Sequence, residues 1–220
     1  MEREKLDKIL KNHELWLNGE GGECADLRGA NLKGADLRNI NLSNIDLRCA
    51  DLYSADLRYA DLRYANLNSA NLSGASLYNA NLTGANLSGA NLYSSNLNNA
   101  NLTNIKTNMY TIGYNLACPE EGSFIGYKKA GKYIVKLLIL EDSKRSSATT
   151  LKCRCDKAKV LDIEKIDTGE KIESTPSDYD INFIYKVGEI VKVDNFDENR
   201  WYECASGIHF FMNKENAIQY

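Results

Sequence analysis

The sequence predicts a mainly β protein whose first half is a solenoid, and three observations support this. Leucine occupies every fifth position from Leu27 to Leu102, sixteen leucines in all. The residue two places before each leucine is small or aliphatic: alanine in thirteen cases, and Ile or Ser in the other three. The residue directly before each leucine is Asp, Asn or, once, Ser.

A period of five excludes both a regular helix and a flat strand. A helix turns about 100° per residue, so a step of five residues would scatter the leucines around it. In a flat strand, an odd step would send successive leucines to opposite faces. Only a chain that turns a corner in every pentapeptide keeps the leucines inside, as in a repeat architecture. The predicted core leucines are Leu27, Leu32, Leu37, Leu42, Leu47, Leu52, Leu57, Leu62, Leu67, Leu72, Leu77, Leu82, Leu87, Leu92, Leu97 and Leu102.

The repeated unit A(D/N)LXX resembles the pentapeptide-repeat proteins. Ala30-Asn31-Leu32-Lys33-Gly34 and Ala85-Asn86-Leu87-Ser88-Gly89 show the unit, and the resemblance covers 80 of 220 residues. It implies a right-handed quadrilateral β-helix with one pentapeptide per side. Sixteen repeats would then form four coils.

The chain is expected to have three parts: residues 1–24, 25–117 and 118–220. Residues 2–17 read as an amphipathic helix that covers the open apolar end of the first coil. Its apolar side is predicted to hold Leu6, Ile9, Leu10, His13 and Leu17.

Residues 118–220 read as a small β-rich α+β domain. The expected strands are Phe124–Tyr127, Tyr133–Leu140, one within Leu151–Ile166, Glu189–Val193, Arg200–Cys204 and Ile208–Phe211, with a closing helix over Lys214–Gln219. The segments Cys118–Gly122, Lys152–Cys155 and Glu203–Phe211 resemble an uncharacterised domain appended to pentapeptide repeats in phage and bacterial proteins. That resemblance implies no known chemistry.

The outward residues of the repeats change character halfway along. Residues 25–65 hold six Asp against six Lys and Arg, whereas residues 66–104 hold no charged residue. Five outward tyrosines are candidates for an interaction surface, because tyrosine is enriched in interfaces. The alternative is that tyrosine is merely tolerated there. These candidates are Tyr53, Tyr59, Tyr64, Tyr78 and Tyr93.

The second domain contains one group of residues that could carry chemistry. Its members, weak candidates for zinc ligands, are Cys118, Cys153, Cys155, Cys204 and His209. Their Cys-x-Cys and Cys-x4-His spacings lack the paired knuckles of strong zinc signatures. Cys204 and His209 could instead form a nucleophile and base, but no third residue to orient them is evident. We interpret these cysteines as structural thiols, with Cys204 at the end of a strand, and expect no cofactor.

Composition restricts the partners. The net charge is −3 and the pI is about 5.5, which gives no general attraction to nucleic acid or anionic membranes. No apolar run approaches the roughly 20 residues of a membrane span. The charged segment Met1–Lys5 is unlike a signal peptide, so we expect a cytoplasmic protein with reduced thiols.

The sequence favours a non-enzymatic interaction scaffold with an unknown protein partner. One alternative comes from the resemblance, because well-known relatives bind DNA gyrase by imitating DNA. Such mimicry needs dense negative charge, whereas residues 25–117 hold six Asp against seven Lys and Arg. The other alternative makes residues 118–220 a metal-binding or Cys/His enzymatic module. We expect this domain to cover the last coil; the oligomeric state stays open.

Overall fold

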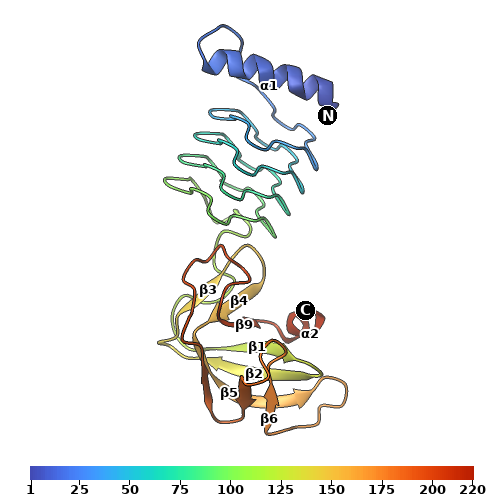
Figure 1. Cartoon of the computed structure of the whole chain (residues 1–220), viewed down its shortest axis with the longest axis vertical. Coiled ribbons are helices and arrows are strands. Elements are labelled where there is room, and N and C mark those ends of the chain that lie inside the picture. The colour runs from blue at the N-terminus through green and yellow to red at the C-terminus, as the bar shows by residue number, and fades with distance from the viewer. The chain divides into compact units, whose positions relative to one another are not determined.

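The computed structural model describes residues 1–220, the whole chain, and is mainly β (Figure 1). The chain divides into two compact units, which are described separately. We call Met1–Asn115 the repeat unit and Leu116–Tyr220 the C-terminal unit. Neither of the two helices has the length and apolar character needed to cross a membrane.

The repeats wind into coils of twenty residues, drawn in Figure 1 as stacked loops. Parallel bridges join residues twenty positions apart, beginning with Asp26 and Asp46. The Leu27 N–H donates to the Asp46 carbonyl at 2.8 Å, and the Asp46 N–H donates to the Ala25 carbonyl at 3.3 Å. This pattern recurs from coil to coil, so the ladder satisfies the backbone polar groups that the inner coils bury.

A tight turn closes each pentapeptide. In the first, the Ala30 N–H donates to the Leu27 carbonyl at 3.1 Å, and Gly29 has a φ of +62°. A positive φ at the third residue is what a type II turn requires. The equivalent position is left-handed in all sixteen repeats, and glycine fills it in five of them. The other eleven are Asn39, Asn44, Cys49, Ser54, Tyr59, Tyr64, Ser69, Asn79, Ser94, Asn99 and Asn104.

The repeat leucines form the core of the coils. Fifteen of them, from Leu27 to Leu97, are at most 3% exposed. Leu102 differs from the prediction because it is only partly buried. It lies in the last full coil, beyond which only Lys106 and Ile112 continue the ladder. Leu102 therefore lacks a complete coil to pack against.

Helix α1 (Arg3–Leu17) lies against the first coil (Figure 1). Of its expected apolar face, only Leu6 and His13 are fully buried. The Ala25 N–H donates to His13 Nδ1 at 3.2 Å, and the Met1 amino group donates to the Asn31 carbonyl at 2.6 Å. Both contacts tie α1 to the start of the repeats.

The C-terminal unit contains a seven-stranded antiparallel sheet in the order β3-β4-β9-β1-β2-β5-β8 and a separate pair, β6-β7. The strands are β1 (Phe124–Ala130), β2 (Tyr133–Ile139), β3 (Arg145–Ser147), β4 (Lys152–Cys155), β5 (Lys157–Lys165), β6 (Ser174–Pro176), β7 (Ile184–Lys186), β8 (Ile190–Lys192) and β9 (Ile208–Phe211). The two longest pairings, β1 with β2 and β2 with β5, form its centre. The single strand expected within Leu151–Ile166 is in fact two strands, β4 and β5.

Helix α2 (Lys214–Gln219) follows β9 directly. The Asn213 side chain caps it by accepting the Glu215 and Asn216 N–H groups at 2.8 and 3.2 Å. Ala217 of α2 packs with Ile134 and Phe211 in a small apolar cluster beside the main core.

The strand expected over Arg200–Cys204 is absent, and the reason is Arg154. This β4 side chain is 1% exposed. Its guanidinium donates to the carbonyls of Asp197, Asn199 and Ser206 at 2.7, 2.7 and 3.2 Å. Because these carbonyls converge on one side chain, residues 197–206 form an irregular loop around Arg154 instead of a strand.

Candidate functional site

The five candidate tyrosines lie at three separate places on the coils. Tyr59 and Tyr78 meet edge to face, with ring centroids 5.8 Å apart. Tyr53 and Tyr93 belong to one column, two coils apart, since Asp51, Asn71 and Asn91 bridge in series. Tyr53, Tyr59, Tyr64 and Tyr93 are exposed, whereas Tyr78 is partly buried.

Tyr64, the most exposed of the five at 64%, stands apart from that pair. Its ring lies over Gly84 of the next coil. Arg58, one coil before Tyr78 in the same column, is the charged residue nearest to the aromatic pair in sequence.

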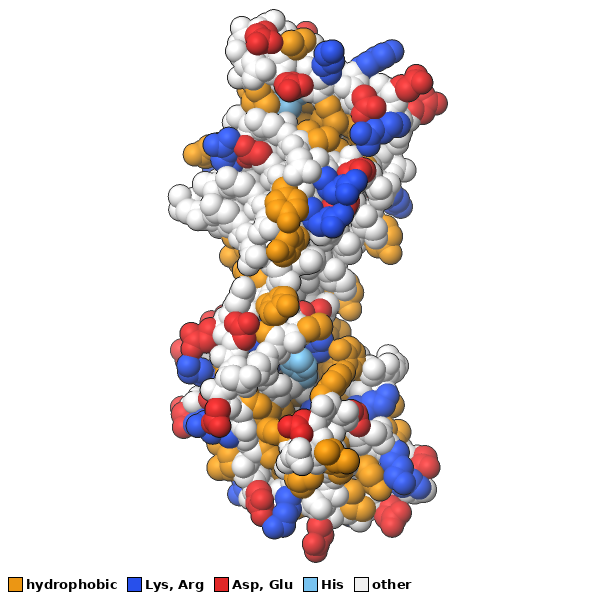
Figure 2. Space-filling view, viewed as in Figure 1, with side chains coloured by type: hydrophobic (Ala, Val, Ile, Leu, Met, Phe, Trp, Pro, Cys, Tyr) orange, Lys and Arg blue, Asp and Glu red, His pale blue; other side chains and the backbone are white.

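Every aspartate of the coils is paired with a cation. Arg28 Nη2 lies 2.5 Å from Asp26 Oδ2, and this bond lowers the pKa of Asp26 to about 2. The same two-residue spacing recurs in four later repeats, whereas Asp51 pairs with Lys33 of the preceding coil at 3.1 Å. The pairs are Asp26–Arg28, Asp36–Arg38, Asp46–Arg48, Asp51–Lys33, Asp56–Arg58 and Asp61–Arg63. The visible face of the repeat unit in Figure 2 accordingly shows charges of both signs toward α1 and uncharged side chains beyond them.

The candidate zinc ligands do not form one site. Cys118, Cys153 and Cys155 are buried, whereas Cys204 is exposed. The contact with Cys118 and burial raise the pKa of the Cys153 thiol, and burial raises that of Cys155. Nowhere in the chain do three or more His, Cys, Asp or Glu side chains converge in a geometry that could hold a metal ion. The expectation that Cys204 ends a strand in the core is wrong.

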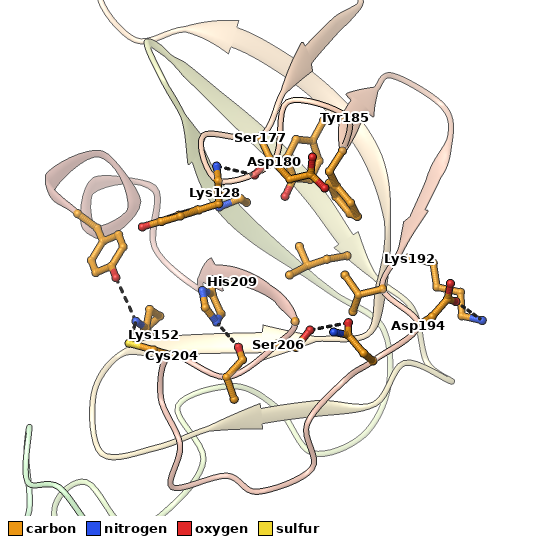
Figure 3. Close-up of a pocket in the computed structure, with 18 residues that line it drawn as sticks. Lys128, Lys152, Ser177, Asp180, Tyr185, Lys192, Asp194, Cys204, Ser206 and His209 are labelled. Carbon is orange, nitrogen blue, oxygen red and sulfur yellow. Dashed lines mark hydrogen bonds and ion pairs between the residues drawn. The ribbon is translucent and has the colours of Figure 1, made fainter.

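Cys204 and His209 instead line a common pocket of about 630 Å³ (Figure 3). Sulfur and imidazole are not bonded to each other. His209 Nε2 donates to the Ala205 carbonyl at 3.0 Å, and Cys204 Sγ lies 4.0 Å from Lys152 Nζ. Cys204 therefore lies against a lysine and not against the histidine that the alternative of a nucleophile and base would require.

Three neighbouring strands supply three of the basic side chains of the pocket, and the fourth, Lys192 of β8, pairs with Asp194 at 3.6 Å. Lys152 comes from β4, His209 from β9 and Lys128 from β1, and these strands are adjacent in the sheet. Residues 193–195 and 204–208 form one wall, the second of these segments being held by Arg154. Phe183 and Tyr185 form another wall, with their rings 5.3 Å apart and edge to face.

Lys128 is the least compensated charge in the pocket. It is 8% exposed, and its Nζ has no hydrogen-bond or salt-bridge partner. Its nearest aromatic contact is the Tyr179 ring, whose centroid lies 5.8 Å away. Burial lowers the pKa of the Lys128 ammonium, and the positive charge of Lys152 lowers it further.

Lys152 is also buried, at 5% exposed. Its Nζ donates to Tyr220 Oη at 3.0 Å and lies 5.0 Å from the centroid of that ring. Burial alone would lower the pKa of Lys152, but the contacts with Tyr220 and Cys204 raise it overall.

His209 is neutral at pH 7. Burial and the charge of Lys152 lower the pKa of His209 to about 4. A carbonyl can only accept, so Nε2 carries the proton and Nδ1 is left as an acceptor. Figure 3 shows the imidazole between Lys128 and Lys152.

Sequence reasoning pointed to His209 and Cys204 but missed both lysines. The available signal was the pattern of their strands. Lys128 lies in the β1 sequence Phe-Ile-Gly-Tyr-Lys-Lys-Ala, and Lys152 precedes Cys-Arg-Cys in β4. A lysine at an inward position between apolar residues indicates a buried ammonium, and buried ammoniums occur at functional sites.

The repeats match known proteins. A family model described as pentapeptide repeats (8 copies) matches residues 25–63 and 65–104. A solved pentapeptide-repeat protein from Nostoc PCC 7120 is 38% identical, over 46% of this chain and 80% of its own, with a TM-score of 0.41. The chain belongs to the pentapeptide-repeat family.

Two further pentapeptide-repeat proteins of known structure are similar to this family member. One, from the cyanobacterium Cyanothece 51142, is 40% identical over 42% of this chain and 66% of its own, with a TM-score of 0.24. The other, from the thylakoid lumen of Arabidopsis thaliana, is 34% identical over 38% of this chain and 66% of its own, with a TM-score of 0.28. A comparison with curated proteins gives no match.

The C-terminal unit of this pentapeptide-repeat protein matches a different model. Residues 114–217 match a family described as being of unknown function (DUF5758). This agrees with the expected uncharacterised domain after the repeats.

Proposed function

We propose that this pentapeptide-repeat protein is a non-enzymatic scaffold that binds a protein partner through the outer surface of its coils. We infer that the coils form a right-handed, four-sided β-helix, whose continuous backbone ladder gives the surface side chains a fixed spacing. Pre-organised side chains lose little entropy on binding, which favours recognition by such a surface.

The observation that carries this proposal is the exposed Tyr59, packed edge to face against Tyr78. Tyrosine and arginine dominate the energetics of protein interfaces, and Arg58 adjoins the pair. The Arg58 guanidinium is already oriented by Asp56, at 2.6 Å. We define Arg58, Tyr59 and Tyr78 as the tyrosine patch and propose it as the centre of the interface.

Affinity capture from the native cell tests the patch. The wild-type chain is expected to retain a specific protein that Tyr59→Ala loses, because interface anchors typically contribute about 2 kcal/mol or more. Tyr110→Ala is the matched control, since Tyr110 is 72% exposed and lies outside the sixteen repeats. Identical capture by wild type and Tyr59→Ala would contradict this assignment.

We further propose that the protein acts in the cytoplasm. All six cysteines are free thiols, as is usual in a reducing compartment. Localisation of the chain by fluorescence microscopy or fractionation in its native cell tests this; recovery from an oxidising compartment would contradict it.

A further inference from the structure

The pocket of the C-terminal unit contains a positive charge that the chain leaves unpaired. Lys128 is 8% exposed, and no acidic side chain approaches its Nζ within salt-bridge distance. The negative charge of Asp178 acts to raise the pKa of Lys128, but through a longer-range electrostatic interaction without direct contact. A mostly buried lysine whose ammonium lines an open pocket and has no carboxylate in contact is available to an anion from outside the chain.

A second ammonium faces the same space. Lys152 uses one of its three donors on Tyr220 Oη and forms no salt bridge. Its charge acts on both Lys128 and His209, which places the three groups in one electrostatic environment. The neutral His209 adds an acceptor at Nδ1 but no charge. Three further charged residues line the pocket: Lys192 and Asp194, which pair with each other at 3.6 Å, and Asp180. Lys128 and Lys152 are therefore the two lysines of the pocket that form no salt bridge.

Two lysines match a phosphate better than a carboxylate. A phosphate monoester carries a charge of about −1.5 to −2 at pH 7. This charge is nearly equal in size, and opposite in sign, to the combined charge of two ammonium groups. Lysine binds phosphate as a point charge, and two lysines supply the two charges that a phosphate dianion needs, whereas a carboxylate needs only one. No arginine lines the pocket, and the nearby Arg154 is occupied by three loop carbonyls.

The rest of the pocket suits an apolar, planar group. Phe183 and Tyr185 provide aromatic surface, and Val193 and Ile208 line the pocket beside them. The volume of about 630 Å³ lies within the range of roughly 300–1,000 Å³ for small-molecule sites. An inorganic phosphate ion would leave most of this volume unfilled.

We propose that this pocket binds a small phosphate monoester with an aromatic or other planar body. The phosphate binds beside the His209 imidazole and is contacted by Lys128 and Lys152, which Figure 3 shows on either side of that ring. The body packs against Phe183 and Tyr185. The site is confined to the C-terminal unit and does not depend on the tyrosine patch. It gives this unit a ligand-binding role alongside the scaffold role of the coils.

Calorimetric titration of the full chain with four probes tests the ligand class. Phenyl phosphate carries both expected groups, phenol carries only the ring, inorganic phosphate carries only the anion, and benzoate replaces the phosphate by a carboxylate. Phenyl phosphate is expected to bind at least tenfold more tightly than each of the other three. No binding of phenyl phosphate at millimolar concentration, or equal binding of any other probe, overturns the proposal.

Two variants test the site. Lys128→Met keeps the length of the side chain and removes the charge, so it is expected to weaken phenyl phosphate binding at least tenfold. It is also expected to raise the melting temperature of the free protein, because the unpaired buried charge is gone. A purely structural lysine would show the opposite effect on melting and none on binding.

The matched control is Lys159→Met in β5, which removes one charge from the same sheet outside the pocket. Its affinity for phenyl phosphate is expected to equal that of the wild type. If Lys128→Met does not fold, Lys152→Met gives the same test of binding. Unchanged affinity in a folded variant of either lysine overturns the assignment.

Discussion

The Tyr64 ring lies directly over the backbone of Gly84 in the next coil. A Cβ atom on Gly84 would come within 2.6 Å of Tyr64 Cδ1 and Cε1. Gly84 also has a φ of +71°, in the left-handed region. This glycine therefore meets two requirements at once: a turn conformation and a close aromatic contact.

Gly84→Ala is expected to destabilise the repeat unit by about 2–3 kcal/mol, through both strain at positive φ and overpacking. Gly29→Ala is the control, because Gly29 has a φ of +62° but no atom within 4 Å of the new Cβ. It should cost only about 1–2 kcal/mol. In a Tyr64→Ala background the two alanine substitutions should cost the same. Chemical unfolding followed by circular dichroism measures these differences; equal costs in the wild-type background would refute the contact.

The inward orientation of the repeat leucines is tested by substitutions at one buried position and one exposed position. Leu72 is 0% exposed, so Leu72→Asp buries a carboxylate without a partner and is expected to prevent folding of the coils. Ser94→Asp adds the same charge at an exposed left-handed position that aspartate tolerates. It should change stability by less than about 0.5 kcal/mol. Soluble yield and the circular dichroism spectrum distinguish the two, and similar behaviour of both variants would count against the inward orientation of the leucines.

The coils were predictable because their pattern is local. A turn in every pentapeptide needs only a residue that accepts positive φ, and burial of leucine follows from the five-residue period. Leu102 is less buried than predicted because its burial depends on the coil that follows, and the sequence period does not reveal how completely that coil forms. The twenty-residue spacing of the ladder came from family resemblance rather than from the residues themselves.

The C-terminal unit was less predictable because its determinants lie far apart in sequence. Trp201 and Tyr202 favour a strand locally, but Arg154 binds the surrounding carbonyls and forces a loop. That same loop exposes Cys204. The pocket could not be inferred for a similar reason. Lys128 and Lys152 line the same pocket only because β9, the last strand, pairs with both β1 and β4 and so joins them in one sheet.

Acid is expected to destabilise the C-terminal unit through His209. Its folded-state pKa is about 4, below the ordinary value of 6.5, so the unfolded chain binds the proton more readily. The stabilisation is complete above about pH 6.5 and is lost as the pH falls toward 4, by roughly 2–3 kcal/mol. His209→Gln keeps a donor for the Ala205 carbonyl and should lose the pH-dependent part of the stability that His209 contributes. Thermal unfolding at pH 7.5 and pH 5 checks this prediction. If the wild type and the variant lose the same stability between these two pH values, the role of His209 is excluded.

The six thiols should divide into two classes of reactivity. Cys24, Cys49 and Cys204 are exposed and are expected to react quickly with a maleimide under native conditions. The buried thiols Cys118, Cys153 and Cys155 should react only on unfolding, because the reagent cannot reach them. Raised pKa values protect Cys153 and Cys155 further, whereas contact with Cys153 lowers the pKa of Cys118 and leaves burial as its only protection. Mass spectrometry of peptides after timed labelling resolves each site. Fast labelling of Cys153, or protection of Cys204, would contradict the arrangement described for β4 and its neighbouring loop.

Gyrase should be unaffected by this protein through charge mimicry. Imitation of DNA requires unpaired negative charge at roughly one charge per 1.7 Å of length. Each of the six coil aspartates is paired with Arg or Lys, and residues 66–104 carry no charge. Replacing the arginines of three pairs, as in Arg38→Gln, Arg48→Gln and Arg58→Gln together, makes the surface more acidic and serves as the comparison. Supercoiling assays with micromolar wild-type protein, with and without a quinolone, are expected to show no change. Relief of quinolone inhibition by the wild type would show that recognition depends on shape or on the C-terminal unit rather than on charge.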